Sequence, residues 1–205
     1  MDPRPPPPLS VPSGQHICLL YREDDERTLE LSRFLAAGRR EQHKLLYIVD
    51  ERAPSVVRRR YAELGVDLDP STGAQVLTTV EAYYPDGRFD PDAMLAGLDA
   101  FSEEAVREGF AGCRCTGEMG WAARRVPGAE RLIEYEARLT GVIERHRFSG
   151  ICQYDVRLFD GPTLLAVLEV HPFLLVRGQV IRNPNHVRGR VPAAPGRDAH
   201  EQLRV

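Results

Sequence analysis

Short, almost continuously apolar runs alternate with amphipathic stretches along most of the chain. The apolar runs predict strands at 16–21, 44–49, 75–79, 110–116 and 150–154, followed by a closing pair at 173–176 and 179–182. Strands of a parallel sheet are buried on both faces, so their sequences are apolar throughout rather than alternating. The pattern therefore predicts a mostly parallel sheet that is covered on both sides.

The amphipathic stretches between these runs predict helices at 25–39, 53–65, 91–108, 128–145 and 162–170. In the first of them, Leu31 and Leu35 recur at helical spacing. The third opens with Asp90 and Pro91, a capping residue followed by a proline that suits the first helical turn. This alternation predicts an α/β fold, a three-layer sandwich. In such folds ligands bind beyond the carboxyl ends of the strands, so the residues at those ends are the first candidates.

The two ends of the chain lack this pattern. Residues 1–13 contain six prolines and predict a disordered tail. Residues 188–205 predict a second flexible tail that contains arginine and proline. Residues 14–187 are left as one domain, which is an ordinary size for a single hydrophobic core.

Composition narrows the class of protein. A hydrophobic fraction of 42% and a charged fraction of 28% are typical of soluble globular proteins. A net charge of −3 argues against direct nucleic-acid binding, which needs a basic face. The apolar runs are too short for a membrane span, and the N-terminus lacks the apolar region of a signal peptide. The four cysteines lie in strand-like segments, as reduced core thiols do, so we expect a cytoplasmic protein.

The first strand and helix have the order of a nucleotide-binding corner but not its residues. A P-loop needs glycines whose N–H groups surround the phosphates and a lysine that reaches the terminal one. The turn at 21–28 contains no glycine, and Lys44, the only lysine of the chain, begins the second strand. The acids at 23–26 would repel a polyphosphate. Their better explanation is the N-terminus of a helix, where negative charge is favourable.

Histidine and cysteine side chains suggest a metal or redox site as one alternative. His16 and Cys18 share a face of the first strand, and Cys113 and Cys115 share a face of the fourth. If these strands were neighbours, the four residues would form a cluster. Because the spacing is not that of a zinc knuckle, buried core thiols are the preferred interpretation.

Other candidates follow the fourth predicted strand and the last predicted helix. Glu118 could act as a general base, but no nucleophile motif accompanies it, so a role in orienting a ligand is preferred. Met119 and Trp121 offer either a soft apolar wall for a small organic ligand or ordinary core packing. His171, which precedes Pro172, is expected to cap helix carbonyls.

Seven segments, in order, resemble a known sensory family. They are HICLLY, LLYIVDE, YYPDGRFDPDAML, GEMGWA, GAERLIEYEARL, ICQYD and HPFLLVRGQVIRNP. Together they resemble the MEDS domain, the methanogen/methylotroph DcmR-type sensory domain, from about Gly14 to Pro184. The segment FLAAGRREQHKLLYIVDE also resembles the core of KaiC/RecA-like ATPases. The resemblance implies a degenerate RecA/KaiC-like fold without the P-loop (Walker A) motif.

The resemblance further implies a non-enzymatic sensor that binds a small organic ligand, such as a hydrocarbon derivative, at the carboxyl edge of the sheet. No output module fits in the remaining residues, so we expect that the chain is a fragment or that the signal passes to a separate partner, namely an anti-sigma factor, a histidine kinase or a transcription regulator. A homodimer is also considered. The residues expected to bind the ligand are His16, Tyr21, Glu118, Met119, Trp121, Gln153, Tyr154, Asp155 and His171.

Within this set, Glu118 and Tyr154 are expected to be polar anchors and Trp121 an apolar wall. We expect no catalytic residue, no metal and no cofactor. Two alternatives stay open. One is a protein–protein interaction module with a vestigial nucleotide cleft. The other is a His/Cys metal or redox sensor.

Overall fold

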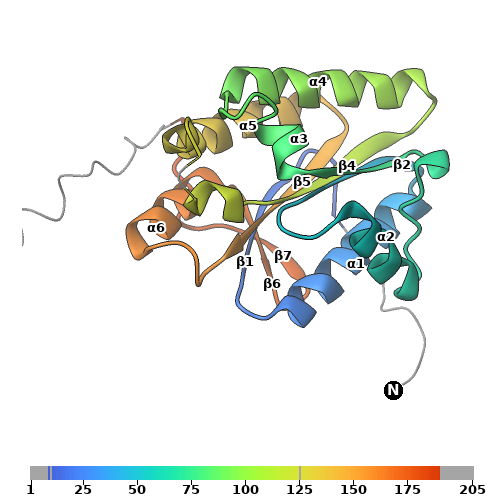
Figure 1. Cartoon of the computed structure of the whole chain (residues 1–205), viewed down its shortest axis with the longest axis horizontal. Coiled ribbons are helices and arrows are strands. Elements are labelled where there is room, and N and C mark those ends of the chain that lie inside the picture. Colours follow the sequence, from blue (N-terminus) through green and yellow to red (C-terminus); the bar gives the residue numbers. More distant parts are fainter. Residues whose placement is uncertain (1–8, 10, 125, 190–205) are drawn as a thin grey trace, which may run out of the picture.

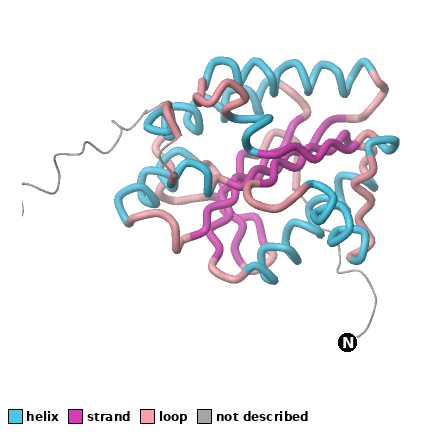
Figure 2. The backbone as a smooth tube through the Cα atoms, viewed as in Figure 1, coloured by secondary structure: helices cyan, strands magenta, loops and turns pink. Residues whose placement is uncertain are grey.

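Seven strands form one sheet in the computed structural model, which describes residues 9, 11–124 and 126–189. The strands are β1 (His16–Tyr21), β2 (His43–Val49), β3 (Ala74–Thr78), β4 (Gly112–Glu118), β5 (Phe148–Asp155), β6 (Phe173–Val176) and β7 (Gln179–Arg182). Their order across the sheet is β3-β2-β4-β5-β1-β6-β7. Every neighbouring pair is parallel except the β6–β7 hairpin. The tube representation shows the strands crossing the centre of the molecule with helices outside them (Figure 2).

Helices cover both faces of this sheet (Figure 1). They are α1 (Asp24–Arg40), α2 (Pro54–Glu63), α3 (Thr79–Tyr83), α4 (Pro91–Arg107), α5 (Leu132–Arg145) and α6 (Gly161–Val170). Short 3-10 turns occur at Pro70–Thr72, Gly120–Ala123 and Ala129–Arg131. None of the helices among the described residues has the length and apolar character needed to cross a membrane.

The alternation of side chains along each strand produces two hydrophobic cores. In β2, Leu46 and Ile48 pack with residues of α4, α5 and α6, whereas Leu45 and Val49 pack with residues of α1 and α2. Both faces of the central strands are therefore buried from solvent, which explains their continuously apolar sequences. The predicted three-layer α/β sandwich with a mostly parallel sheet is confirmed.

Several element boundaries differ from the prediction, and glycines explain two of them. The strand predicted at 110–116 is β4 at Gly112–Glu118, because Gly109 adopts a left-handed conformation (φ +86°) after α4. The helix predicted at 128–145 starts at Leu132, because Gly128 (φ +90°) and a 3-10 turn precede it. The sequence interpretation missed α3.

The signal for α3 was present in the sequence as a capping box. Thr78 accepts a hydrogen bond from the backbone N–H of Glu81, and the Glu81 carboxylate accepts one from the backbone N–H of Thr78. This reciprocal pattern marks a helix start even when the helix is short.

Part of the segment predicted as a disordered tail belongs to the core. Leu9 and Val11 are 3% and 4% exposed and pack in the core beneath α1. The Val11 carbonyl accepts a hydrogen bond from Arg114 at 3.4 Å, and the Leu9 N–H donates to the Arg33 carbonyl at 3.2 Å. The prediction was wrong at these two positions because a proline-rich composition concealed two apolar anchors. Residues 1–8 and 10, and residues 190–205 of the predicted C-terminal tail, lie outside the described residues.

Removal of residues 1–13 tests this anchoring. We expect the free energy of unfolding to fall by about 2–4 kcal/mol, because Leu9 and Val11 lose their burial. Chemical denaturation of the two proteins measures the difference. Removal of residues 1–8 alone is the matched control and should leave stability nearly unchanged. Equal stability of both truncated proteins would show that the two anchors contribute nothing.

Candidate functional site

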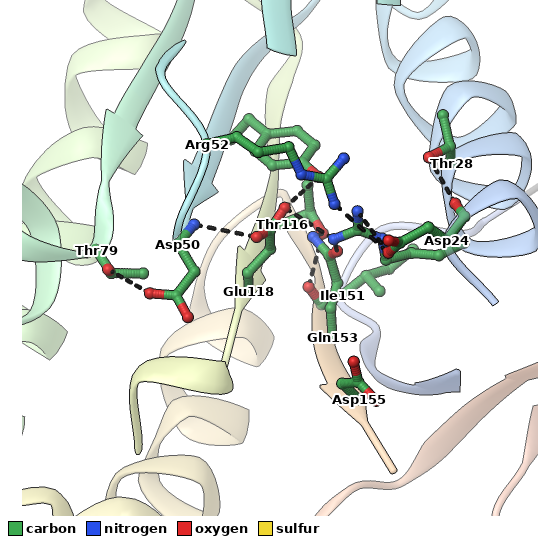
Figure 3. Close-up of polar contacts among 12 residues, drawn as sticks. Asp24, Thr28, Asp50, Arg52, Thr79, Thr116, Glu118, Ile151, Gln153 and Asp155 are labelled. Carbon is green, nitrogen blue, oxygen red and sulfur yellow. Dashed lines mark hydrogen bonds and ion pairs between the residues drawn. The ribbon is translucent and has the colours of Figure 1, made fainter. Parts of the chain in front are cut away.

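Polar side chains gather at the carboxyl edge of the sheet (Figure 3). Glu118 ends β4 and lies opposite Gln153 of β5, and Tyr21 ends β1 opposite Asp155. Asp50 follows β2 directly. Because these strands are parallel, their ends reach the same edge. The structure thus brings four of the nine predicted residues together here.

Arg27 extends from the first turn of α1 into this group and is 1% exposed. Its Nη1 donates to Oε1 of Glu118 at 2.8 Å and lies 3.3 Å from Oε1 of Gln153. Its guanidinium carbon lies 4.9 Å from the centre of the Tyr21 ring, a cation–π contact. Its Nη2 lies 3.2 Å from Oδ1 of Asp24. One buried cation therefore joins α1 to the ends of β1, β4 and β5.

The Glu118 carboxylate is held from three directions. Oε1 accepts hydrogen bonds from Arg27 and from the Tyr47 hydroxyl at 3.0 Å, and Oε2 accepts one from the Asp50 backbone N–H at 3.1 Å. Burial raises the pKa of Glu118, and the Arg27 charge and these hydrogen bonds act in the opposite direction. Both oxygens thus have the partners that a buried carboxylate needs.

The corner between β1 and α1 has no phosphate-binding loop. Only Arg22 and Glu23 separate the strand from the helix, which is too short a connection to surround a phosphate with backbone N–H groups. The Arg27 guanidinium is positioned at the strand ends behind this corner. Lys44 lies near the amino end of β2, where its Nζ contacts Glu104 at 2.6 Å.

A cavity of about 280 Å³ lies beside this network, between α1, β2 and α2. Tyr47 and Tyr61 form its inner wall, and their ring centres are 5.4 Å apart. The other lining residues are Thr28, Arg52, Val56, Val57, Arg59, Arg60 and Glu63. Because the Tyr47 hydroxyl also donates to Glu118, one side chain belongs to both the cavity wall and the buried network.

Met119 and Trp121 pack in the core that faces α4 and α5, and neither is exposed. The Trp121 ring stacks on Tyr83 with 4.9 Å between ring centres and contacts Phe89 at 4.7 Å. The Tyr83 hydroxyl donates to the Met119 sulfur at 3.4 Å. Of the two roles considered for this pair, core packing is the one their surroundings favour.

His16, Tyr154 and His171 lie on the other face of the sheet from Glu118. Along β5, Gln153 faces α1 whereas Tyr154 faces α5. The Tyr154 hydroxyl donates to Glu136 of α5. Glu118 and Tyr154 are thus directed to opposite faces, which corrects the expectation that they anchor one ligand together.

His171 caps α6, as predicted. Its Nδ1 lies 2.7 Å from the Val167 carbonyl oxygen, one turn earlier in the helix. Burial is the main cause that lowers the pKa of both His16 and His171 to about 3, so the two imidazoles are neutral.

The four cysteines are free and buried, as the sequence predicts for core thiols. The grouping of His16 and Cys18 with Cys113 and Cys115 does not form, because β5 lies between β1 and β4. Cys152 of β5 is instead the thiol next to His16, with Sγ 3.5 Å from Nε2.

Sequence reasoning did not place Arg27 or Glu136 in the protein interior, although Arg27 is central to the carboxyl-edge network and Glu136 to the polar group on the opposite face. Arg27 follows an acidic, solvent-exposed stretch, and nothing in the neighbouring sequence indicates that its side chain faces inward. For Glu136 the sequence does contain a signal, because this residue follows the buried Tyr135 and precedes the buried Leu139 by three residues on α5. A carboxylate on the apolar face of an amphipathic helix indicates a buried partner.

Comparisons with known proteins agree with this architecture. The family profile described as "MEDS: MEthanogen/methylotroph, DcmR Sensory domain" matches residues 15–172. A KaiC-like protein of Pyrococcus horikoshii is similar in structure, with a TM-score of 0.56, 13% identity, and coverage of 80% of this chain and 70% of that one. The flagellar accessory protein FlaH of Methanocaldococcus jannaschii gives a TM-score of 0.57, 11% identity, and coverage of 83% and 76%. A search of curated proteins gives no match. Identities this low show a shared RecA/KaiC-like fold alone.

Substitution of Arg27 by methionine tests the ion pair. The variant leaves Glu118 buried without its cation, and we expect a loss of about 3–5 kcal/mol in the free energy of unfolding at about pH 7. A carboxyl whose folded-state pKa is raised favours the folded state at low pH and loses that contribution as pH rises. Without Arg27 that pKa rises further, so the loss should be smaller at about pH 5.

Denaturant unfolding at the two pH values measures this difference. Arg52→Met is the control, because Arg52 is exposed and pairs only with Asp24 at 3.5 Å among the described residues. The free energy of unfolding of Arg52→Met should be lower than that of the wild type by less than about 1 kcal/mol at both pH values. A pH-independent loss in Arg27→Met would show that Glu118 does not depend on the guanidinium.

Proposed function

The chain belongs to the MEDS family of sensory domains, and on this premise we propose that it is a non-enzymatic sensor that binds a small organic molecule at the carboxyl edge of its sheet. A sensory or regulatory role follows from the family. The ligand site and the signalling route below are our inferences from the geometry.

A binding role is better supported than a catalytic one. Glu118 is the strongest general-base candidate at this edge, but its two oxygens already accept hydrogen bonds from Arg27, Tyr47 and the Asp50 N–H. A general base must reach the proton that it removes. A carboxylate held in this way instead fixes the position of its neighbours.

The observation that carries the proposal is the double role of Tyr47. Its ring lines the 280 Å³ cavity, while its hydroxyl donates to Glu118. A ligand that displaces this ring would disturb the hydrogen bonds of Glu118, and through them α1 and three strand ends. Occupancy of the cavity would thereby be converted into a change at the protein surface.

The cavity lining indicates the chemistry of the ligand. Its volume lies just below the range of about 300–1,000 Å³ that is common for small-molecule sites, so the ligand is small. Val56 and Val57 favour an aliphatic portion, and Arg59 with its neighbouring arginines favours an anionic or strongly polar group. A short-chain carboxylate combines both properties.

We propose that the signal passes to a separate regulatory protein, with an anti-sigma factor, a histidine kinase or a transcription regulator as the candidates. A second function, an interaction module that binds no small molecule, is favoured by one specific observation. The polar side chains that a vestigial nucleotide cleft would expose are here bonded to one another and buried. The experiment below separates the two functions.

Filling the cavity tests the ligand proposal. Val56→Trp places a large ring at the cavity wall and leaves Arg27 and Glu118 themselves unchanged. With butyrate as the probe, we expect the wild-type melting temperature to rise with ligand concentration. The variant should bind at least about tenfold more weakly, a difference of roughly 1.4 kcal/mol.

Val106→Trp is the matched control, because Val106 is an exposed residue of α4 outside the cavity wall, and it should behave as wild type. Native mass spectrometry of the protein purified from the organism that produces it would detect any small molecule that stays bound during purification. Equal butyrate binding by Val56→Trp would overturn the site. No binding of butyrate and no retained molecule would support the interaction module instead.

A further inference from the structure

Four side chains of metal-ligating type converge on the face of the sheet opposite the carboxyl-edge network. Glu136 is at the centre, with its Oε2 3.1 Å from Nε2 of His16, 3.3 Å from Sγ of Cys152 and 3.5 Å from Nε2 of His171. The Cys152 Sγ lies 3.5 Å from Nε2 of His16. All four atoms lie within 4.8 Å of one another.

We propose that His16, Glu136, Cys152 and His171 bind a divalent metal ion, and that Zn²⁺ is the ion that fits best. The site is independent of the small-molecule cavity and its ligand. It also differs from the His/Cys cluster considered from the sequence, with which it shares only His16.

The spacing of the four atoms suits tetrahedral coordination. Zn²⁺ binds nitrogen and oxygen at about 2.0–2.2 Å and sulfur at about 2.3 Å. Ligand atoms at the corners of such a tetrahedron are roughly 3.3–3.7 Å apart. Four of the six distances between these atoms, from 3.1 to 3.5 Å, are close to that range, and the other two are within 4.8 Å, so an ion would draw the ligands slightly together. Two imidazoles, a thiolate and a carboxylate form a donor set that favours zinc over calcium or magnesium.

His171 supplies the observation that points most directly to a ligand. Its Nδ1 faces the Val167 carbonyl at 2.7 Å, so the ring proton belongs on that nitrogen. The lone pair of Nε2 is then directed into the cluster, where this fully buried atom has no hydrogen-bond partner among the residues that the structure describes. An unpaired buried acceptor is costly, and a metal ion at this position would satisfy it.

The outer contacts of the other ligands have the arrangement seen around metal sites. The Nδ1 of His16 lies 2.9 Å from Oγ1 of Thr140, which leaves Nε2 directed at the cluster. The Tyr154 hydroxyl donates to Oε1 of Glu136 and leaves Oε2 for the ion. Such outer partners fix the orientation of metal ligands and tune their basicity.

Charge balance explains how an ion could be kept in a fully buried place. The thiolate of Cys152 and the carboxylate of Glu136 together carry two negative charges, which equal the charge of Zn²⁺. Both histidines are neutral, so the loaded site has no net charge and avoids most of the penalty for burying ions. All four side chains belong to residues that are at most 5% exposed.

A cavity lies next to the ligand residues. A cavity of about 570 Å³ between α5 and the start of β6 is lined by Thr140, the partner of His16, and by Pro172, the neighbour of His171. His186 and Glu144 also line this cavity, which is the nearest space from which an ion would reach the cluster.

Metal analysis of the full chain tests the proposal. Purified protein is stripped with a chelator and titrated with Co²⁺, which reports tetrahedral thiolate coordination by intense visible bands and a sulfur-to-metal charge-transfer band. We expect one Co²⁺ per chain with both features, displacement by Zn²⁺, and a higher melting temperature with Zn²⁺. Weak octahedral absorption or no binding by the wild type would overturn the site.

Variants assign the ligands. Cys152→Ser should abolish the charge-transfer band, and His171→Gln should weaken Co²⁺ binding about a hundredfold or more. Cys113→Ser is the matched control, since Cys113 is a buried thiol that contacts Ser102 outside the cluster, and it should keep the wild-type spectrum. Loss of the band in Cys113→Ser with retention in Cys152→Ser would contradict the assignment. If a variant fails to fold, the wild-type titration alone decides.

Discussion

The ion pair between Arg27 and Glu118 is the contact on which the carboxyl edge of this protein depends. A helix of a RecA/KaiC-like fold sends its first-turn arginine between the strand ends, where it meets Glu118 and Gln153. The same position could not hold a polyphosphate and this guanidinium network together, because the connecting loop has two residues and is followed by acids. The fold is shared with the KaiC-like protein and FlaH, and at this corner an internal salt bridge lies where a phosphate-binding loop would be expected.

Side-chain alternation along β5 separates two polar groups that lie one residue apart in sequence. Gln153 faces α1 and the Arg27 network, whereas Cys152 and Tyr154 face α5 and Glu136. The Arg27 network, which lies beside the proposed ligand cavity, and the metal site that we propose are therefore on opposite faces of β5. The strand is internal to the sheet and is paired with β4 on one side and with β1 on the other.

Patterning alone predicted the layered α/β fold, because strands buried on both faces have continuously apolar sequences. It also predicted that the short connection between β1 and α1 lacks the residues of a phosphate-binding loop. It missed the inward orientation of Arg27 and Glu136, since the partner of each residue is brought near only by the assembled sheet. Trp121 shows the opposite error. Its position after a strand end suggested contact with a ligand, but its ring turns inward and packs against Tyr83 and Phe89. Leu9 and Val11 were hidden by the prolines around them.

The central claim is that this corner of the fold no longer binds nucleotide, because Arg27 and the acids of α1 replace the phosphate site. Isothermal titration calorimetry of the wild-type protein with Mg-ATP tests it most directly. The account predicts no binding heat, with any dissociation constant weaker than about 1 mM. Saturable binding in the micromolar range would contradict it.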